Sequence, residues 1–362
     1  MPELPEVETV ARDLRGLIVG ATITGAAGDW PRAIASHPTV EAFATDVAGR
    51  RVEAVGRRAK LVVVELSGGA ALTIHLKMTG QLFVVPAATP GDRHVHVALA
   101  LDDGRELRFR DIRKFGRIGL WPRDPATGAV LDGEGGTDLF AATGPEPLDD
   151  AFTLRAFRAR LRGRRQRLKP LLLDQGFVAG VGNIYADEAL WRSRLHPLRR
   201  AASLRRPDEA RLYRDLRAIL AEAVERRGSS IDDYTAPDGD GSMQERLEVY
   251  QRTGEPCPRC GRPIRRIVLG ARATHFCSWC QRLPAADRAS GAAAILRAVR
   301  APATKGRRWT ELAAEGSLGL TRDEAERAAA RARAERTRRA AATRRADARA
   351  GADARAGAGE SD

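Results

Sequence analysis

Leu61-Val62-Val63-Val64-Glu65-Leu66 is the first of three similar segments, followed by Ala71-Leu72-Thr73-Ile74-His75-Leu76 and His94-Val95-His96-Val97-Ala98-Leu99. Each is a short apolar run rich in β-branched residues, and turn signals such as Ser67-Gly68-Gly69 separate them. Several short strands at this spacing, within residues 52–121, predict a β-sandwich or a barrel.

A helix is predicted before this sheet and several helices after it. Residues 3–18 show apolar side chains at steps of three and four residues and end before Gly20, a helix stop signal. Residues 124–150 are rich in Gly, Pro and Asp, which is typical of a linker. The apolar period then becomes helical, which predicts helices over 151–163, 167–175, 184–193 and 207–227. We therefore expect an α+β fold, with an N-terminal β-sandwich behind a leading helix and a helical C-terminal part.

The balance of charges narrows the kind of partner. The chain has 362 residues, enough for about two domains, and carries 61 Lys and Arg against 47 Asp and Glu, a net charge of +14. A chain this basic is expected to bind a polyanion, with an anionic membrane surface as the alternative. No run of about 18 apolar residues occurs, so we expect no membrane span. The acidic start, Met1-Pro2-Glu3-Leu4-Pro5-Glu6, is unlike a secretory signal, which favours an intracellular, cytoplasmic protein.

The four cysteines form two C-x-x-C pairs, Cys257-Pro258-Arg259-Cys260 and Cys277-Ser278-Trp279-Cys280. Each pair can donate two thiolates from a tight turn, and two such turns close a tetrahedron around zinc. Four thiolates leave no open position for water, so the pattern predicts one structural zinc ion (Zn2+) bound by Cys257, Cys260, Cys277 and Cys280. A redox dithiol is the alternative, although it would not need the second pair. Arginines crowd the cluster, which favours phosphate contact over a merely solvated face.

Pro2 follows the initiator methionine, which is generally removed before a small second residue. It would then present a free secondary amine. An α-amine has a pKa near ~7.7–8, so much of it is neutral and nucleophilic at cellular pH. Attack of this amine on an aldehyde-level sugar carbon gives a charged iminium, which is a good electron sink. The alternative is that Pro2 only starts a helix, a position that suits proline.

The chain resembles the bacterial formamidopyrimidine-DNA glycosylases in a series of motifs that occur in one order between residues 2 and 284. The motifs are Pro2-Glu3-Leu4-Pro5-Glu6-Val7-Glu8-Thr9, Arg57-Arg58-Ala59-Lys60, His75-Leu76-Lys77-Met78-Thr79-Gly80, Asp111-Ile112-Arg113-Lys114-Phe115-Gly116, Gly144-Pro145-Glu146-Pro147-Leu148, Gly180-Val181-Gly182-Asn183-Ile184-Tyr185-Ala186 and the cysteine cluster.

The resemblance implies a division into functional parts. Residues 1–135 would form the N-terminal catalytic β-sandwich domain, 150–240 a helix–two-turn–helix DNA-binding domain, and 245–284 a zinc-finger hairpin. Residues 285–362 lie outside the resemblance. Their Ala/Arg-rich composition is low in complexity, so we expect a tail that is largely disordered, with a fraying helix around 321–345.

The implied activity is that of a bifunctional DNA glycosylase and AP lyase of base-excision repair. Such an enzyme flips an oxidised purine, 8-oxoguanine or a formamidopyrimidine, out of duplex DNA, and the Pro2 amine displaces the base before β,δ-elimination cuts the strand. Its partner would be damaged double-stranded DNA, and we expect a monomer associated with the nucleoid. The catalytic residues implied are Pro2 as nucleophile, Glu3 for proton transfer, Lys60 as a phosphate contact that assists elimination, and Arg272 as a phosphate clamp. Glu6 either orients the amine or is a first-turn acid favoured by the helix dipole.

The same resemblance implies DNA contacts. Met78, Arg113 and Phe115 match the three side chains that fill the space left by the flipped nucleotide. Asn183 matches a phosphate-binding residue in the turn between two helices. Further candidates for phosphate contact are Arg165, Lys169 and His94, and a buried histidine is the alternative for His94.

The sequence departs from the family pattern at three places. Gly241-Ser242-Met243-Gln244 lacks the aromatic residue usual in the loop that covers the flipped purine, and Gln251 and Lys77 each replace a glycine. Two alternatives stay open: a family member that prefers oxidised pyrimidines, and a non-catalytic zinc-ribbon DNA-binding protein. Leu4 favours the purine branch, whereas Pro2, Glu3 and Lys60 together argue against the non-catalytic protein.

Overall fold

The structure is a computed structural model that describes residues 1–133, 136–230, 241–288, 292 and 295–296. The chain divides into two units, Met1–Ala298 and Val299–Asp362. The helix expected around 321–345 and the rest of the tail beyond 296 lie outside the described residues.

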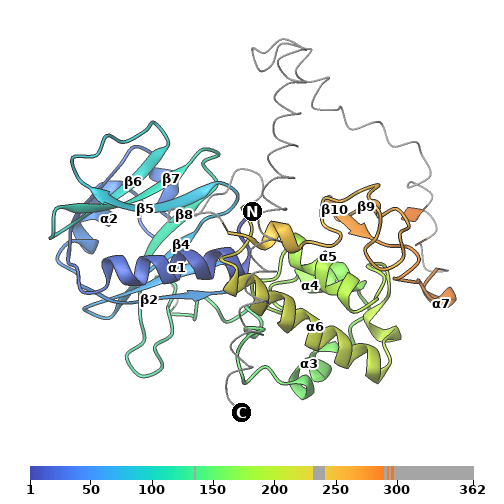
Figure 1. Cartoon of the computed structure of the whole chain (residues 1–362). Helices are drawn as coiled ribbons and strands as arrows, with labels where there is room; N and C mark the ends of the chain where they lie inside the picture. Colours follow the sequence, from blue (N-terminus) through green and yellow to red (C-terminus); the bar gives the residue numbers. More distant parts are fainter. Residues whose placement is uncertain (134–135, 231–240, 289–291, 293–294, 297–362) are drawn as a thin grey trace, which may run out of the picture. The chain divides into compact units, whose positions relative to one another are not determined.

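The N-terminal part contains two antiparallel four-stranded sheets (Figure 1). One sheet has the order β1-β6-β7-β5, formed by Ile23–Gly28, Val95–Leu101, Arg105–Asp111 and Gly80–Pro86. The other has the order β2-β3-β4-β8, formed by Val52–Arg58, Leu61–Leu66, Ala70–His75 and Arg117–Pro122. Val62, Val64 and Leu66 alternate with less buried residues and are fully buried, so β3 presents one face to the core. The predicted α+β class and N-terminal sheets are confirmed.

More helix accompanies these sheets than the single leading helix expected. The leading helix, α1, spans Leu4–Ile18. The structure adds α2, Val40–Val47, and a 3-10 turn, η1, over Pro31–Ala33. The buried residues of α2, Val40, Phe43 and Val47, recur at steps of three and four residues, so the apolar period of this helix is present in the sequence. Its start is fixed locally, because the Thr39 hydroxyl accepts a hydrogen bond from the Ala42 N–H at 3.1 Å.

The C-terminal part is helical and has its own core. The helices are α3 (Leu154–Leu161), α4 (Leu168–Leu173), α5 (Asn183–Arg192) and α6 (Arg206–Glu225), with 3-10 turns η2 (Ala201–Ser203) and η3 (Met243–Arg246). The predicted helices are confirmed, with ends that differ by up to three residues. Strands β9 (Arg265–Leu269) and β10 (Arg272–Phe276) form the expected hairpin. Within the first unit, α1 contacts α6, and α5 contacts α4, α6 and β10 (Figure 1).

The packed chain extends beyond the expected start of the tail at 285. A short helix, α7, spans Ala285–Arg288, and its Asp287 carboxylate is buried and accepts a hydrogen bond from the Ser203 hydroxyl at 2.7 Å. One buried acid thus holds residues 285–288 to the helical part. Among the described residues, no helix is long and apolar enough to cross a membrane.

Candidate active site and DNA-contact loops

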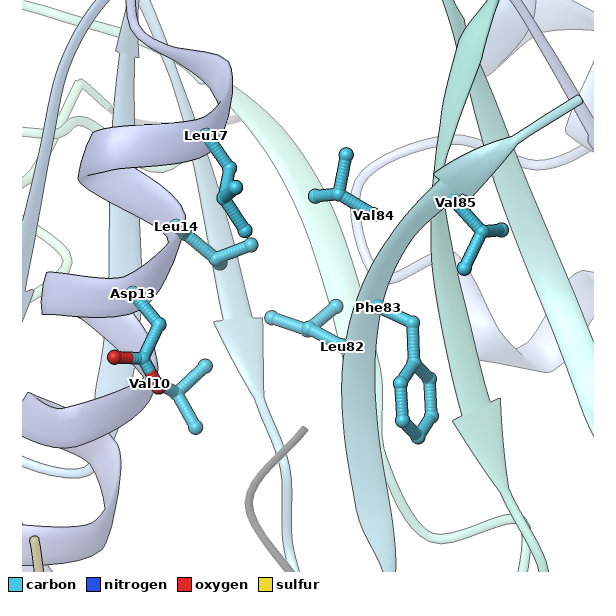
Figure 2. A pocket seen from close by; sticks show the side chains of 8 residues that line it. All are labelled: Val10, Asp13, Leu14, Leu17, Leu82, Phe83, Val84 and Val85. Atoms are coloured by element: carbon cyan, nitrogen blue, oxygen red, sulfur yellow. The ribbon is translucent and has the colours of Figure 1, made fainter. Parts of the chain in front are cut away.

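Two cavities differ sharply in chemistry. One, of about 190 Å³, lies between α1 and β5 and is lined by Val10, Leu14, Leu17 and other apolar side chains (Figure 2). Its one charged residue, Asp13, accepts hydrogen bonds from both terminal nitrogens of Arg227, at 3.0 and 2.7 Å. With its carboxylate paired and its other walls apolar, this cavity offers no reactive group.

The second cavity, of about 220 Å³, collects residues from distant parts of the chain. Its lining residues are Met1, Glu3, Met78, Asn183, Ile184, Tyr250, Ala271, Arg272 and Ala273. They come from the start of α1, the turn before β5, the start of α5 and the turn of the zinc hairpin. Four of the residues implied as catalytic or DNA-binding, Glu3, Met78, Asn183 and Arg272, thus meet at one cavity, next to Pro2.

Glu3 is held by the N-terminal end of α5. Its carboxylate accepts hydrogen bonds from the backbone N–H groups of Gly182 and Ile184, both at 2.8 Å, and from that of Tyr185 at 3.4 Å. A side chain at position 182 would not fit, since a Cβ atom there would lie 2.3 Å from Glu3 Cδ. The Gly-rich turn before α5 is therefore shaped around this carboxylate.

Burial and the neighbouring charges act in different directions on the pKa of Glu3. Burial raises the pKa of Glu3, the positive charge of Lys60 opposes this, Glu6 adds to it, and the N–H groups of α5 oppose it. The net result is a raised pKa, which favours the protonated acid. Burial lowers the pKa of Lys60, and Arg272 lowers it further, against the attraction of Glu3. A carboxyl group and an amine whose protonation is easily shifted thus lie close together, as proton transfer requires.

Glu6 secures the start of α1 and has no described contact with Pro2. Its carboxylate accepts hydrogen bonds from the Glu3 N–H at 2.9 Å, the Tyr185 hydroxyl at 2.5 Å and the Ser229 N–H at 2.9 Å. Burial and the nearby Glu6 raise the pKa of Tyr185 well above its usual value, so the phenol stays a donor. Glu6 thereby ties α1 to α5 and to the chain after α6.

Lys60 lies in a two-residue turn that is held in place by hydrogen bonds to Glu146. Residues Ala59 and Lys60 join β2 to β3, with Ala59 at φ 53°. The Glu146 carboxylate accepts hydrogen bonds from the Ala59 N–H at 2.7 Å, from Arg57 at 2.6 Å and from Arg58 at 2.8 Å. These contacts lower the pKa of Glu146 despite its burial, so it stays ionised and holds the turn.

Two loops bring the three expected insertion side chains together. Met78 and Phe115 are 39% and 47% exposed, unusual values for large apolar side chains. Arg113 joins them, since its guanidinium lies 4.9 Å from the centre of the Phe115 ring and donates to the Met78 sulfur at 3.1 Å.

The buried carboxylate of Asp111 connects these two loops. It accepts hydrogen bonds from the Thr79 hydroxyl, from the Arg113 N–H at 3.2 Å and from the Gly116 N–H at 2.6 Å. The Arg113 N–H also donates to the Thr79 hydroxyl oxygen at 3.1 Å. The loop of Met78 and the loop of Phe115 are therefore held as one unit.

The four cysteine sulfurs lie within 4.8 Å of one another. Four thiolates at such spacing fit a single tetrahedral zinc ion. The hairpin between the two cysteine pairs is anchored to α5, because the Asp187 carboxylate accepts a hydrogen bond from the His275 N–H at 2.8 Å. Lys169 Nζ donates both to Asp187 at 2.6 Å and to the Ala273 carbonyl at 3.1 Å. Arg272 is exposed at the start of β10, next to the cavity.

Three family models match the chain in order: the formamidopyrimidine-DNA glycosylase N-terminal domain over residues 1–118, the formamidopyrimidine-DNA glycosylase H2TH domain over 143–235, and the zinc finger found in FPG and IleRS over 254–283. A curated relative from Herpetosiphon aurantiacus, named formamidopyrimidine-DNA glycosylase, is 48% identical over 283 residues, which are 78% of this chain and 100% of the relative. The chain belongs to the formamidopyrimidine-DNA glycosylase family.

Solved structures of this family share the fold. A complex of the wild-type Lactococcus lactis Fpg with DNA containing N7-benzyl-Fapy-dG is 35% identical, with a TM-score of 0.69 over 78% of this chain and 100% of that one. A MutM complex with DNA containing carbocyclic 8-oxo-G is also 35% identical, with a TM-score of 0.70 over the same shares. In this glycosylase family the four clustered cysteines form the zinc finger, so the expectation of one structural zinc ion is confirmed.

The remaining sequence candidates have different surroundings. Arg165 is exposed, and His94 is half-buried on the loop before β6, where its carbonyl accepts from the Asp111 N–H at 2.9 Å. Asn183 lines the cavity, and its side-chain oxygen is buried without a hydrogen-bond partner. Lys169, by contrast, is fully buried against Asp187, so it supports the hairpin and does not offer its charge at the surface.

Sequence reasoning missed the residues that act over long distances in the chain. Glu146 and Asp187 stand in or near motifs, but their partners Ala59 and His275 lie 87 and 88 positions away in the sequence. The acid at Glu146 stands within the run Gly144-Pro145-Glu146-Pro147. This local signal could have suggested a residue that holds another segment in place.

Proposed function

We propose that this chain is a bifunctional DNA glycosylase and AP lyase of base-excision repair that removes oxidised purines from duplex DNA. The observation that carries the proposal is the placement of Glu3. A buried carboxylate directly after Pro2 is held by the start of α5, faces a cavity and is influenced by Lys60. The relatives crystallised with formamidopyrimidine and 8-oxoguanine DNA support the class of lesion.

In the proposed reaction, Pro2 is the nucleophile. Met1 lines the cavity and Pro2 is buried next to it, so removal of Met1 would leave the secondary amine at the cavity wall. The amine attacks C1′ of the damaged nucleotide, the glycosidic bond breaks, and the base leaves with a proton. The C1′–O4′ bond of the sugar ring then breaks, O4′ takes up a proton, and C1′ becomes a charged iminium. The iminium makes the C2′ proton acidic, and loss of that proton expels the 3′ phosphate in β-elimination. A second elimination releases the 5′ phosphate.

Glu3 and Lys60 supply the proton transfers in this scheme. The raised pKa of Glu3 suits a group that gives a proton to the sugar ring or the leaving base and takes one back later. Lys60 contacts phosphate and, because its own pKa is lowered, can exchange a proton with its surroundings. The Glu146 contacts hold its turn in place during both steps.

The DNA contacts are proposed to surround the cavity. Met78 and Phe115 enter the stack where the flipped nucleotide was, and Arg113 contacts the orphaned base. Arg272 and Asn183 bind the phosphates beside the lesion, with Arg165 and His94 farther along the backbone. Zinc, when bound, holds the hairpin together, and Arg272 is placed by the frame of β9 and β10.

The proposed division of labour follows the sequence. Residues 1–135 form the catalytic domain, 150–240 the DNA-binding helical domain, and 245–284 the zinc finger. We propose that the enzyme acts as a monomer on damaged double-stranded DNA at the nucleoid in the cytoplasm.

Borohydride trapping tests this function. Incubated with duplex DNA holding 8-oxoguanine opposite cytosine and then reduced, the protein should become covalently attached to DNA through Pro2, as peptide mapping would show. The matched control retains Met1 and should not trap. A duplex holding thymine glycol tests the preference for purines. Trapping through a lysine with Pro2 unmodified would contradict the assigned nucleophile.

A further inference from the structure

Lys77 occupies a backbone conformation that lysine does not favour. Its φ is 55°, in the left-handed region that glycine enters freely and other L-residues enter at a cost. A residue held in such a conformation often marks a functional requirement, because a better-suited residue is easily available.

The conformation belongs to the turn that presents Met78. Lys77 lies between β4 and β5, and its N–H donates to His75 Nδ1 at 3.0 Å, which closes the turn. The next residue, Met78, is exposed beside the cavity. The second insertion loop repeats this arrangement, since Lys114 has φ 57° and directly precedes the exposed Phe115.

The positive charge of Lys77 has no matching acid among the described residues. The positive charges of Lys77 and Lys60 act on His75, and together with burial they lower its pKa to about 4. Lys60 is balanced by Glu3, whereas Lys77 forms no ion pair within the described residues. A cationic side chain that forms no ion pair with the described residues can bind an external anion.

We propose that Lys77 is a DNA-contacting residue, whose ammonium binds a backbone phosphate beside the nucleotide that Met78 displaces. The strained backbone is the cost of placing a cation there. The inference rests on the proposed function, because it assumes that Met78 enters the stack of a duplex. It adds to that function a contact that glycine at this position could not make.

The test uses substitutions that separate strain from charge. K77G removes both, whereas K77Q removes only the charge. R194G is the matched control: Arg194 is exposed, has φ 56°, and follows the C-terminal end of α5, about 15 Å along the helix from the end that binds Glu3. K77G and R194G therefore make the same change of backbone and of charge at different places.

The measurements are the melting temperature and the affinity for a duplex with a tetrahydrofuran abasic-site analogue opposite cytosine, over a range of salt. K77G should melt about 2 °C higher, because strain is relieved. It should bind about fivefold more weakly, with a log–log salt slope smaller by about 0.9. K77Q should show the same loss of affinity and slope without the gain in melting temperature. R194G should melt higher and bind as the wild type does.

Wild-type affinity and slope in K77G would overturn the proposal, as would an equal loss in R194G. Borohydride trapping of the unmodified enzyme is measured in parallel. If trapping at Pro2 fails while K77G still loses a phosphate contact, the fault lies with the proposed chemistry and not with the Lys77 contact.

Discussion

Glu3 tolerates little change, because both of its carboxylate oxygens accept hydrogen bonds from the backbone. Gly182 and Tyr185 donate to one carboxylate oxygen, and Ile184 donates to the other. Glutamine has the same shape, but its amino group would face one of these N–H groups. The residue therefore combines its proposed proton-transfer role with a structural one.

We expect Glu3→Gln to lower the rate of base release by at least about a hundredfold, since general acid–base catalysis contributes about that much. The melting temperature should also fall, because a buried N–H loses its acceptor. Single-turnover release of 8-oxoguanine measures the first effect. Binding to the abasic-site analogue, unchanged within a few-fold, would show that the variant is folded. Base release at the wild-type rate would remove Glu3 from the mechanism.

His75 makes stability depend on pH. Its pKa falls to about 4 in the folded protein, against about 6.5 in an unfolded chain, because of burial and the charges of Lys77 and Lys60. Between these values the unfolded chain binds the additional proton, so the free energy of unfolding decreases as the pH falls from 6.5 to 4 and levels off below. Denaturant unfolding at several pH values measures this slope. His75→Gln should flatten it in this window, and an unchanged slope would show that other groups cause it.

At the scale of elements, α5 joins most parts of the site. Its start holds Glu3, and its middle holds the zinc hairpin through Asp187. Next to Asp187, the Glu188 carboxylate accepts from the backbone N–H groups of 248–250. At its end, the carbonyls of Trp191 and Arg192 accept hydrogen bonds from Arg259 of the zinc knuckle. A helix of ten residues thus fixes the relative placement of the proposed nucleophile, Pro2, and the proposed phosphate clamp, Arg272.

The two insertion loops form a second such element, with Asp111 at its centre. Asp111→Asn leaves one acceptor oxygen for three donors, so the loops of Met78 and Phe115 should lose their fixed spacing. Lost hydrogen bonds to a buried charged group cost about 1.5–3 kcal/mol, and we expect excision of 8-oxoguanine to slow about tenfold or more.

Cleavage of a ready-made abasic site is the internal comparison for this variant, because it needs less help from the insertion loops. It should slow less than base excision. Thr79→Val should reproduce the effect of Asp111→Asn, and Thr79→Ser, which keeps the hydroxyl, should not. Equal slowing of both reactions would indicate general damage to the fold.

Local patterns explain which elements were predictable. The apolar period located α1, the helices α3 to α6 and strands β3, β4 and β6, since each repeats over several residues. It missed α2, although α3 has the same length, and β1, where Gly25, Ala26 and Ala27 give little apolar signal. The motifs marked the site residues, but their tethers depend on contacts between distant segments, such as Ala59 with Glu146. No local pattern contains that information.

At the scale of the molecule, the zinc finger supports DNA binding from a distance. Cys277→Ser should reduce bound zinc from about one per chain to a small fraction, because a structural site needs all four thiolates. Affinity for duplex DNA should fall, since Arg272 loses its frame. Metal analysis and binding measurements on the same preparation test this. A zinc-free protein with normal affinity would show that the contacts of Asp187 are enough to hold the hairpin.

The segment after Ala298 lies outside the described residues. The first unit ends there, and the Herpetosiphon aurantiacus relative is matched over its whole length by 78% of this chain. The segment is rich in Arg, and Ala346-Asp347-Ala348-Arg349-Ala350-Gly351 is repeated directly by residues 352–357. Arginines beside small residues favour non-specific contact with phosphates.

Removing residues 299–362 should therefore leave excision of 8-oxoguanine intact at low salt and weaken binding to undamaged duplex. Each lost phosphate contact should reduce the log–log salt slope by about 0.9, because fewer counterions are released. The deletion keeps α7, whose Asp287 holds the helical part, so a loss of stability is not expected. A full-length variant with Arg331, Arg333, Arg338 and Arg339 changed to Gln is the matched control and should lose part of the same slope. A truncated chain without excision at any salt concentration would instead show that the catalytic fold needs this segment.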